Sequence, residues 1–202
     1  MPDFNERSRR AYNAKADGYE DSREGLYTGG LQKLLLAEMK WDKNQSVLDV
    51  ACGDGRFLAS VFKRKPIKGF GIDISEKMAA RAAAKNPGME FYVSGCEKMP
   101  FPDASMDIIT VCAAYHHFPD TAAFAEEARR IVKPGGSLYV ADMYMPSFVR
   151  VLLNPFVPFL LRDGDVKIYS PDEIIKTFER FGFVKINLKI TGNVQILSFI
   201  KS

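Results

Sequence analysis

The chain has 202 residues, of which 47% are hydrophobic, and a formal net charge of +3 at pH 7. This length and composition predict one globular domain, and the small, scattered positive charge gives no case for nucleic-acid binding. Cys52, Cys96 and Cys112 are too sparse, and odd in number, for a disulfide framework, so we expect a reducing, cytoplasmic location. Residues 1–20 lack the apolar core of a signal peptide.

The first 45 residues predict a helical cap that precedes the main sheet. Residues 5–19 indicate a polar helix that breaks near Gly18, and residues 22–30 indicate a glycine-containing loop. Residues 31–39 carry apolar side chains at helical spacing, which predicts an amphipathic helix packed on the sheet. Trp41 predicts packing in the core or at the sheet edge.

The stretch from Ser46 to Leu58, S-V-L-D-V-A-C-G-D-G-R-F-L, predicts a strand that turns through glycines into a helix. Gly53 and Gly55 let the backbone adopt positive φ and let a ligand approach without a Cβ in the way. At the carboxyl edge of a parallel sheet, such a turn is where open α/β folds bind nucleotide-like ligands. A short glycine motif also occurs as a plain turn, so by itself it leaves both interpretations open.

A second short strand, residues 68–74, ends at Asp73, about 20 residues after the glycine turn. An acid at this position can accept hydrogen bonds from ribose hydroxyls. The alternative is that Asp73 caps the next helix, residues 75–85, although Ser75 could do so equally well. We favour the ribose interpretation.

Residues 90–94, 107–113 and 137–142 predict three further strands, with a helix at 121–132 and a turn at 133–136. The only two histidines, His116 and His117, follow the fourth strand. Histidine suits proton transfer near neutral pH, so either is a candidate catalytic base, and a structural role in orienting the loop stays open. No His, Cys or Asp cluster has the spacing of metal ligands, so we expect no metal.

Four motifs between Ser46 and Asp142 resemble, in ordered succession, those of one enzyme family: V-L-D-V-A-C-G-D-G, G-I-D-I-S, E-K-M-P-F-P-D-A-S-M-D-I-I and R-I-V-K-P-G-G-S-L. The family is the class I S-adenosylmethionine-dependent methyltransferases, in the small-molecule type related to ubiquinone and menaquinone biosynthesis. The resemblance implies an α/β fold, a Rossmann-like, doubly wound seven-stranded sheet, mostly parallel with an antiparallel C-terminal hairpin strand. It also implies methyl transfer from S-adenosylmethionine to a small, apolar or aromatic molecule.

The resemblance implies a cofactor site at the carboxyl ends of the first four strands. Asp49, Ala51, Gly53 and Gly55 would hold the methionine end, where Ala51 replaces the first glycine of the family pattern. Asp73 would bind the ribose, and Ile74, Met78 and Cys96 would contact the adenine. Cys112 and Ala113 would form the floor near the sulfonium. Tyr12 and Tyr19 would close the site or pack the helix, and both alternatives stay open. We expect Asp54 to face solvent or the loop backbone.

The segment after the third strand departs from the family pattern. Gly95 stands where the family has an Asp that accepts a hydrogen bond from the adenine amino group. The N–H of Cys96 could still donate to the ring, while Glu97, a carbonyl or water would have to accept from the amino group. One missing hydrogen bond is worth about 1 kcal/mol.

The departure leaves a non-catalytic S-adenosylmethionine- or S-adenosylhomocysteine-binding protein as an alternative function. An NAD-dependent oxidoreductase is the other alternative. Its G-x-G-x-x-G motif is incomplete here, because Arg56, Phe57 and Leu58 follow Gly55.

Residues 143–161 are strongly apolar and interrupted by prolines, which makes them too short and broken for a membrane span. Left exposed, side chains such as Phe148, Leu152, Phe156 and Leu161 would exceed what soluble monomers usually expose. We assign residues 143–170 as an acceptor-pocket insertion after the cofactor-binding core, residues 46–142. A homodimer contact and a peripheral membrane contact remain alternatives.

The final segment, residues 171–202, predicts a helix followed by a hairpin. Ser170, Pro171 and Glu173 form the start signal of the helix, and Gly182 ends it. Strands are expected at 183–189 and 194–200, joined by a loop with Gly192 and Asn193.

Overall fold

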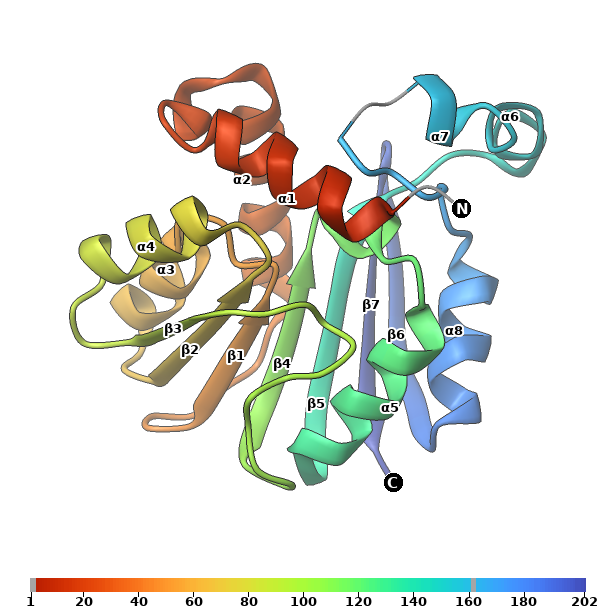
Figure 1. Ribbon diagram of the computed structural model, residues 1–202. Helices are drawn as coiled ribbons and strands as arrows, with labels where there is room; N and C mark the ends of the chain where they lie inside the picture. Colours follow the sequence, from red (N-terminus) through yellow and green to blue (C-terminus); the bar gives the residue numbers. More distant parts are fainter. Residues whose placement is uncertain (1–2, 161–162) are drawn as a thin grey trace.

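The structure is a computed structural model that describes residues 3–160 and 163–202. Seven strands form one sheet: β1 (Ser46–Val50), β2 (Lys68–Asp73), β3 (Glu90–Val93), β4 (Met106–Cys112), β5 (Val132–Met143), β6 (Phe183–Thr191) and β7 (Val194–Lys201). Their order across the sheet is β3-β2-β1-β4-β5-β7-β6 (Figure 1). Only β7 runs antiparallel to its neighbours among these pairs, which confirms the predicted sheet.

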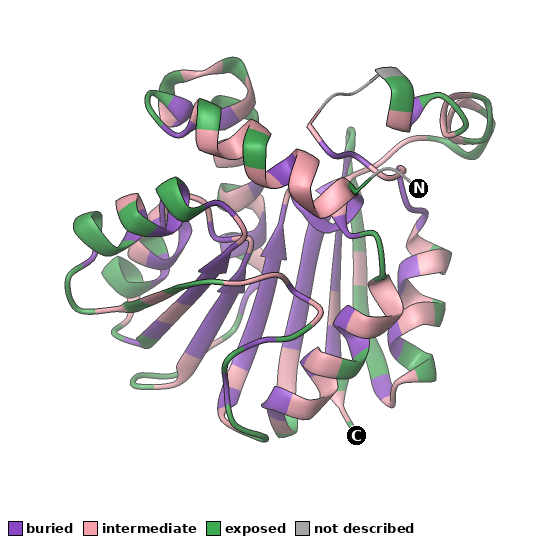
Figure 2. Cartoon of the chain, in the orientation of Figure 1, coloured by how far each residue is buried: buried purple, intermediate pink, exposed green. Residues whose placement is uncertain are grey.

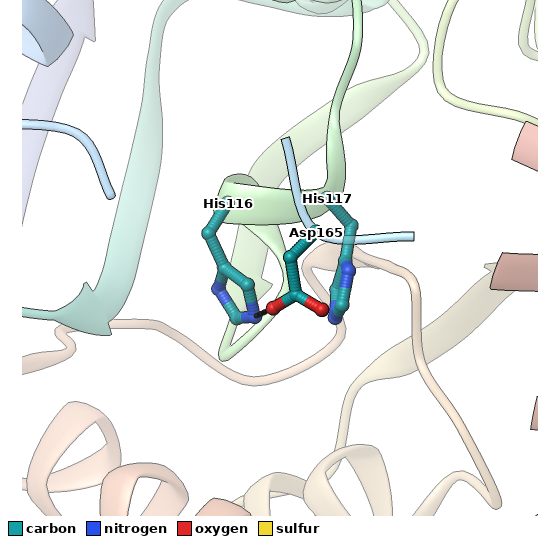
Figure 3. Close-up of side chains that lie close together, drawn as sticks. All are labelled: His116, His117 and Asp165. Carbon is teal, nitrogen blue, oxygen red and sulfur yellow. Dashed lines mark ion pairs between the residues drawn. The ribbon is translucent and has the colours of Figure 1, made fainter. Parts of the chain in front are cut away.

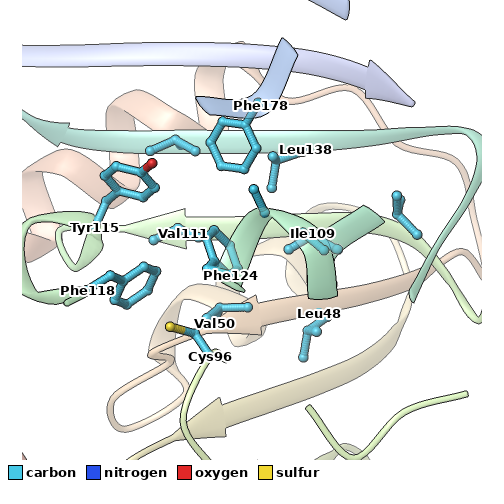
Figure 4. Packing of buried hydrophobic residues seen from close by; sticks show 14 of the residues in the cluster. Leu48, Val50, Cys96, Ile109, Val111, Tyr115, Phe118, Phe124, Leu138 and Phe178 are labelled. Carbon is cyan, nitrogen blue, oxygen red and sulfur yellow. The ribbon is translucent and has the colours of Figure 1, made fainter. Parts of the chain in front are cut away.

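Helices cover both faces of this sheet because strand residues alternate between two apolar clusters. Val47 packs with α2 (Arg23–Glu38) and α3 (Arg56–Arg64) on one face. Leu48 and Val50 pack with α5 (Thr121–Ile131) and α8 (Pro171–Arg180) on the other. Figure 4 shows this second cluster, in which Phe124 and Phe178 lie over the sheet. Burying each of these two side chains stabilises the fold by about 1.5–3 kcal/mol.

The N-terminal cap differs from the sequence prediction in one respect. The first helix, α1 (Phe4–Lys15), ends before Gly18, where φ is +78°, as predicted. The loop predicted at 22–30 is wrong, because α2 already begins at Arg23, after a short 3-10 helix η1 (Tyr19–Asp21). Ser22 caps α2, and a Cβ on Gly25 would lie 1.9 Å from the carbonyl oxygen of Tyr19. Gly25, although it lies within α2, therefore allows this helix to pack closely against the backbone of η1.

A second correction concerns the turn predicted at 133–136, which lies within β5. Met106 pairs with Val132, and Ile108 pairs with Ser137, so residues 133–136 form a wide bulge opposite Asp107. Gly135 has φ +72°, which is the turn chemistry that the sequence indicated. The hydrogen bonds of the strand continue on both sides of the bulge.

The apolar segment forms two short helices, α6 (Ser147–Leu153) and α7 (Val157–Leu160), above the carboxyl edge of the sheet (Figure 1). Their side chains are largely exposed: Phe148 is 78% and Phe159 is 81% accessible, and most of α6 is green in Figure 2. Leu161, predicted with them, lies outside the described residues. No helix in the described ranges combines the length and apolarity that crossing a bilayer requires.

The C-terminal segment follows the prediction. Ser170 and Glu173 form a reciprocal capping box at the start of α8, with Pro171 at its first position. The helix ends at Arg180, shortly before Gly182, which has φ +75°. Strands β6 and β7 pair as the expected hairpin.

Candidate functional site

The site lies where the strand order reverses, between β1 and β4, at the carboxyl edge of the sheet. A cavity there holds about 840 Å³ free of protein atoms, its open mouth included. The ends of β1, β2 and β4 and the loop after β3 form its floor, and α1, η1 and α2 cover it. Its lining contains most of the predicted site residues, namely Tyr19, Ala51, Gly53, Asp73, Ile74, Met78, Gly95, Cys96, Cys112, Ala113 and His117.

Four predicted site residues do not line this cavity themselves. They are Asp49, Gly55, Glu97 and His116. Gly55 has φ +77°, and a Cβ there would lie 2.7 Å from Asn86 Nδ2, so it serves close packing of the turn against the end of α4 (Glu76–Lys85). A Cβ at Gly53 would meet no atom within 4 Å, which leaves space for a ligand at that point of the turn.

Asp73 faces the cavity and also holds the glycine turn. Its Oδ2 accepts from the backbone N–H of Gly53 at 2.8 Å, and its Oδ1 accepts from that of Ser75 at 2.8 Å. Ser75 Oγ accepts from Met78 N, so Ser75 caps α4 and the alternative role of Asp73 as the helix cap is not observed. Burial raises the pKa of Asp73 to about 6. Each carboxylate oxygen retains a lone pair for a further donor such as a ribose hydroxyl.

Asp49 lies under the cavity floor. The Thr110 hydroxyl donates to Asp49 Oδ1 at 2.7 Å, and the side chain of Asp49 is buried. Burial raises the pKa of Asp49 to about 7, and the nearby carboxylate of Asp73 acts in the same direction. A contact between Asp49 and a ligand stays a prediction.

Asp54 does not face solvent, because its carboxylate is buried in an ion-pair cluster; the expected alternative, a contact with the turn backbone, is present, since the Arg56 N–H donates to Asp54 Oδ1 at 3.4 Å. Lys85 Nζ lies 2.7 Å from Asp54 Oδ2, and Arg56 Nε lies 3.3 Å from Oδ1. Burial alone would raise the pKa of Asp54, but Lys85 and Arg56 outweigh it and lower that pKa. The turn therefore fixes Asp54 as the anchor of Arg56.

Arg56 is a cavity residue that the sequence reasoning missed. Its guanidinium lies over the ring of Tyr19, 5.4 Å from the centroid, and its Nη1 donates to the carbonyl of Gly25 at 3.3 Å. Its Nη2 is buried and has no hydrogen-bond partner among the described residues. The sequence signal that could have identified Arg56 is its position, as a basic residue directly after the glycine turn.

The departure at Gly95 brings a different carboxylate close. A Cβ on Gly95 would lie 2.8 Å from Glu97 Oε2, and Asn5 of α1 donates to Glu97 Oε1 at 3.2 Å. Met78 is buried below Tyr19 and lines the cavity. Glu97 therefore lies beside the cavity edge and is tied to the N-terminal cap.

His116 is buried behind the cavity lining. It lies in the 3-10 helix η2 (Tyr115–His117), its Nδ1 is 2.7 Å from Asp142 Oδ1, and its backbone N–H donates to Asp142 Oδ2 at 2.8 Å. Its Nε2 is 3.6 Å from Asp165 Oδ1. Burial would lower the pKa of His116, but Asp142 and Asp165 outweigh it and raise that pKa. His116 itself does not reach the cavity.

His117 does line the cavity, and Tyr12 lies against it. The Tyr12 hydroxyl is 3.0 Å from His117 Nε2 and also donates to Glu24 Oε1 at 2.8 Å. Burial and the neighbouring His116 lower the pKa of His117 well below its usual value, so His117 is neutral at pH 7. The contact places Tyr12 at the site and supports the closing role over plain helix packing.

Asp142 and Asp165 were missed because the chain gives no local pattern for them. Asp142 ends the expected fifth strand, and Asp165 lies in a loop that follows the apolar helices. The backbone N–H of Val166 donates to the His116 carbonyl at 2.9 Å and brings this loop to η2. Only the assembled fold juxtaposes these residues with the histidines.

Comparison with known proteins gives consistent matches. Residues 48–140 match the family described as "Methyltransferase domain". A demethylmenaquinone methyltransferase of Thermotoga maritima is 31% identical over 171 residues, which cover 74% of this chain and 73% of that protein. A 2-methyl-6-phytyl-1,4-hydroquinone methyltransferase of Synechocystis sp. is 38% identical over 157 residues, or 74% of this chain and 46% of that protein.

Among solved structures, the protein in complex with the Trm112 methyltransferase activator of Haloferax volcanii matches with a TM-score of 0.82 and 22% identity, covering 94% of this chain and 96% of that chain. At this identity the match supports the fold. The chain spans about half the length of several curated relatives that it matches.

Proposed function

The chain belongs to the S-adenosylmethionine-dependent methyltransferases related to the ubiquinone and menaquinone biosynthesis enzymes, and on this basis we propose that it methylates a small apolar or aromatic molecule. The observation that carries the proposal is the continuous cavity at the switch point. Asp73 and the Gly53 turn line one side of it, and His117 and Phe118 line the other. One cavity can therefore hold a nucleoside and an acceptor in contact, which supplies proximity and a water-poor environment.

The residues present fit S-adenosylmethionine, which supplies an electrophilic methyl group on a sulfonium. Arg56 Nη2, buried and without a partner among the described residues, suits the carboxylate of the methionine end. Asp73 suits the ribose hydroxyls, and the apolar side chains of Ile74 and Met78 suit the adenine face. Glu97, close to the Gly95 edge, is the acceptor that we assign to the adenine amino group.

On the acceptor side, His117, Phe118 and Tyr12 line the cavity. Relatives named for demethylmenaquinone and for a phytyl hydroquinone support an acceptor with an aromatic ring, hydroxyl groups and an apolar tail. An aromatic lining suits the ring, while His117 and Tyr12 offer polar atoms to a hydroxyl. His116, buried behind them, orients the η2 segment.

Most apolar side chains of α6 and α7 are exposed, apart from the buried Val157, and none of the described residues in these helices lines the cavity. This arrangement does not favour the predicted pocket-lining role of Phe148, Leu152 and Phe156. We assign them to an external contact, either with a second copy of the chain or with a lipid surface. The polar end of the segment, at Asp163 and Asp165, is the part that reaches the site.

Titration and turnover test the proposal. The chain should bind S-adenosylmethionine and S-adenosylhomocysteine with one ligand per chain, and NAD should not compete. Incubation with S-adenosylmethionine and a panel of hydroquinones and phenols should give a product heavier by one methylene, detected by mass spectrometry. Binding without any product across the panel would favour the non-catalytic alternative, and competition by NAD would contradict the cofactor assignment.

A further inference from the structure

Three buried side chains of the kind that bind transition metals come together beside the cavity. Ligand atoms of His116, His117 and Asp165 all lie within 4.8 Å of one another. Figure 3 shows the Asp165 carboxylate beside both imidazoles, whose ring centroids are 4.1 Å apart. The two histidines come from η2, and Asp165 comes from the loop before α8. The sequence expectation of no metal rested on local spacing, which cannot reveal this juxtaposition.

The hydrogen bonding of His116 is that of a metal ligand. Asp142 binds its Nδ1 at 2.7 Å, which leaves Nε2 directed toward Asp165. A carboxylate on one ring nitrogen fixes the tautomer and raises the basicity of the other nitrogen, as it does in carboxylate–histidine–zinc arrangements. The distance from His116 Nε2 to Asp165 Oδ1, 3.6 Å, is too long for a hydrogen bond. It is close to the separation of two ligands that each bind one Zn²⁺ at about 2.0–2.2 Å.

The charges around the cluster also favour a cation. Asp142 and Asp165 flank His116, while Glu24 and Asp163 are both bonded to Lys15 at 2.7 and 2.5 Å. Even with His116 protonated, these four carboxylates exceed the two cations, Lys15 and His116, that bind them. A divalent ion would balance the excess.

We propose that His116 Nε2, His117 Nε2 and the Asp165 carboxylate bind one divalent transition-metal ion, with Zn²⁺ the best match to the donor set, and that a hydroxyl oxygen of the acceptor takes an open position on this ion. The second half of the proposal rests on the proposed methyltransferase function. Two histidines and one carboxylate leave coordination positions free, as in catalytic sites. Because His117 also lines the cavity, the ion lies next to the acceptor side.

Such an ion would activate the acceptor by lowering the pKa of the bound hydroxyl, as it does for bound water. The hydroxyl proton leaves to solvent, the methyl group moves from sulfur to the acceptor, and the sulfur leaves as the neutral thioether of S-adenosylhomocysteine. In this arrangement His117 is a ligand and not a base. The Tyr12 hydroxyl gives up its contact with His117 and keeps its hydrogen bond to Glu24, at 2.8 Å.

The test measures metal binding directly on the full chain after treatment with a chelator. Titration with Zn²⁺ should give one tight site, and Co²⁺ should give visible absorption bands of a nitrogen- and oxygen-ligated ion. Asp165→Asn and His117→Gln should each weaken Zn²⁺ binding at least tenfold. Asp172→Asn, a matched change to an exposed carboxylate in the first turn of α8, should leave it unchanged.

S-adenosylhomocysteine titration of every variant shows that the cofactor side remains folded. Equal Zn²⁺ affinity in the wild type and Asp165→Asn would overturn the site, as would a thiolate charge-transfer band of Co²⁺, which would mean binding to the buried cysteines. Unchanged turnover after removal of the ion would overturn its role in activating the acceptor. Specific Zn²⁺ binding without turnover of any acceptor would instead leave the site standing and count against the proposed function.

Discussion

Replacing Asp49 by Asn should stabilise the chain at alkaline pH and not at acidic pH. The Asp49 carboxylate is buried, and its one hydrogen-bond partner among the described residues is the Thr110 hydroxyl, at 2.7 Å. Its pKa of about 7 in the folded chain compares with an ordinary value of 3.8. At about 1.4 kcal/mol for each pKa unit, ionised Asp49 costs the folded state about 4 kcal/mol above pH 7.

The sign of the effect follows from the order of ionisation. Well below pH 3.8 the carboxyl is protonated in both states and imposes no cost. As pH rises, the unfolded chain ionises first, so the free energy of unfolding falls until Asp49 ionises in the folded chain near pH 7. The Asn amide can still accept from Thr110, but its NH₂ needs an acceptor, which imposes a constant cost of about 1–3 kcal/mol if none is found.

Urea unfolding of both proteins at several pH values separates these contributions. The difference in unfolding free energy, Asp49→Asn minus wild type, should rise by about 2.5 kcal/mol between pH 5 and pH 8. Asp42→Asn, at a side chain that is 90% exposed, should show no such rise. A difference that does not change with pH would refute the reasoning. If Asp49 also contacts the methionine end of the cofactor, the variant should bind S-adenosylhomocysteine more weakly while being more stable.

Four further changes test other parts of the site and its surface. Asp73→Ala should weaken S-adenosylhomocysteine binding by about 1.5–3 kcal/mol, and it should lower the unfolding free energy because two backbone donors lose their acceptor. The affinity of the wild type should also fall below pH 6, where Asp73 becomes protonated. Unchanged affinity in the variant would remove Asp73 from the site. Arg56→Met should weaken binding of S-adenosylhomocysteine and not of 5′-methylthioadenosine, which lacks the carboxylate; equal losses would place Arg56 elsewhere. Gly95→Asp should tighten binding by about 1 kcal/mol if Glu97 gives way, and weaker binding would indicate that it does not. Phe148→Ser should shift a dimer to monomer in sedimentation or reduce binding to lipid vesicles, and a loss of cofactor binding instead would mean a core role.

The residues of the proposed cofactor half of the site could be placed together from the sequence because each strand–helix turn is local. The strand, the glycines and the helix that follow Ser46 lie next to one another in sequence, and so do the end of β2 and Asp73. Each βα turn therefore carries its own signal, and ordinary turn chemistry fixes the backbone. Where local prediction erred, at Asp54, tertiary contacts decided: Lys85 of α4 draws this carboxylate into the protein.

The errors in the fold have the same origin. Gly25, Gly29 and Gly30 indicated a loop. Ser22 nevertheless starts a helix there, because tertiary packing outweighs the low helix propensity of these glycines. Likewise, Lys133 to Gly136 has the composition of a turn and folds as a bulge within a strand, because the pairing of β5 with β4 resumes on both sides. The exposure of α6 and α7 could not be predicted, because an apolar pattern does not distinguish a pocket wall from an external contact.

The acceptor half of the site depends on contacts between distant segments, and this has a consequence for how the protein works. Tyr12 and Lys15 come from α1, Glu24 from α2, and the Asp163–Asp165 loop from beyond the apolar helices, and each is bonded to another of these segments. Most of these bonds are ion pairs at partly exposed positions, which individually contribute little to stability. These ion pairs therefore add little to the free energy that holds the cap in place, whereas the floor of the cavity is built into the buried strands.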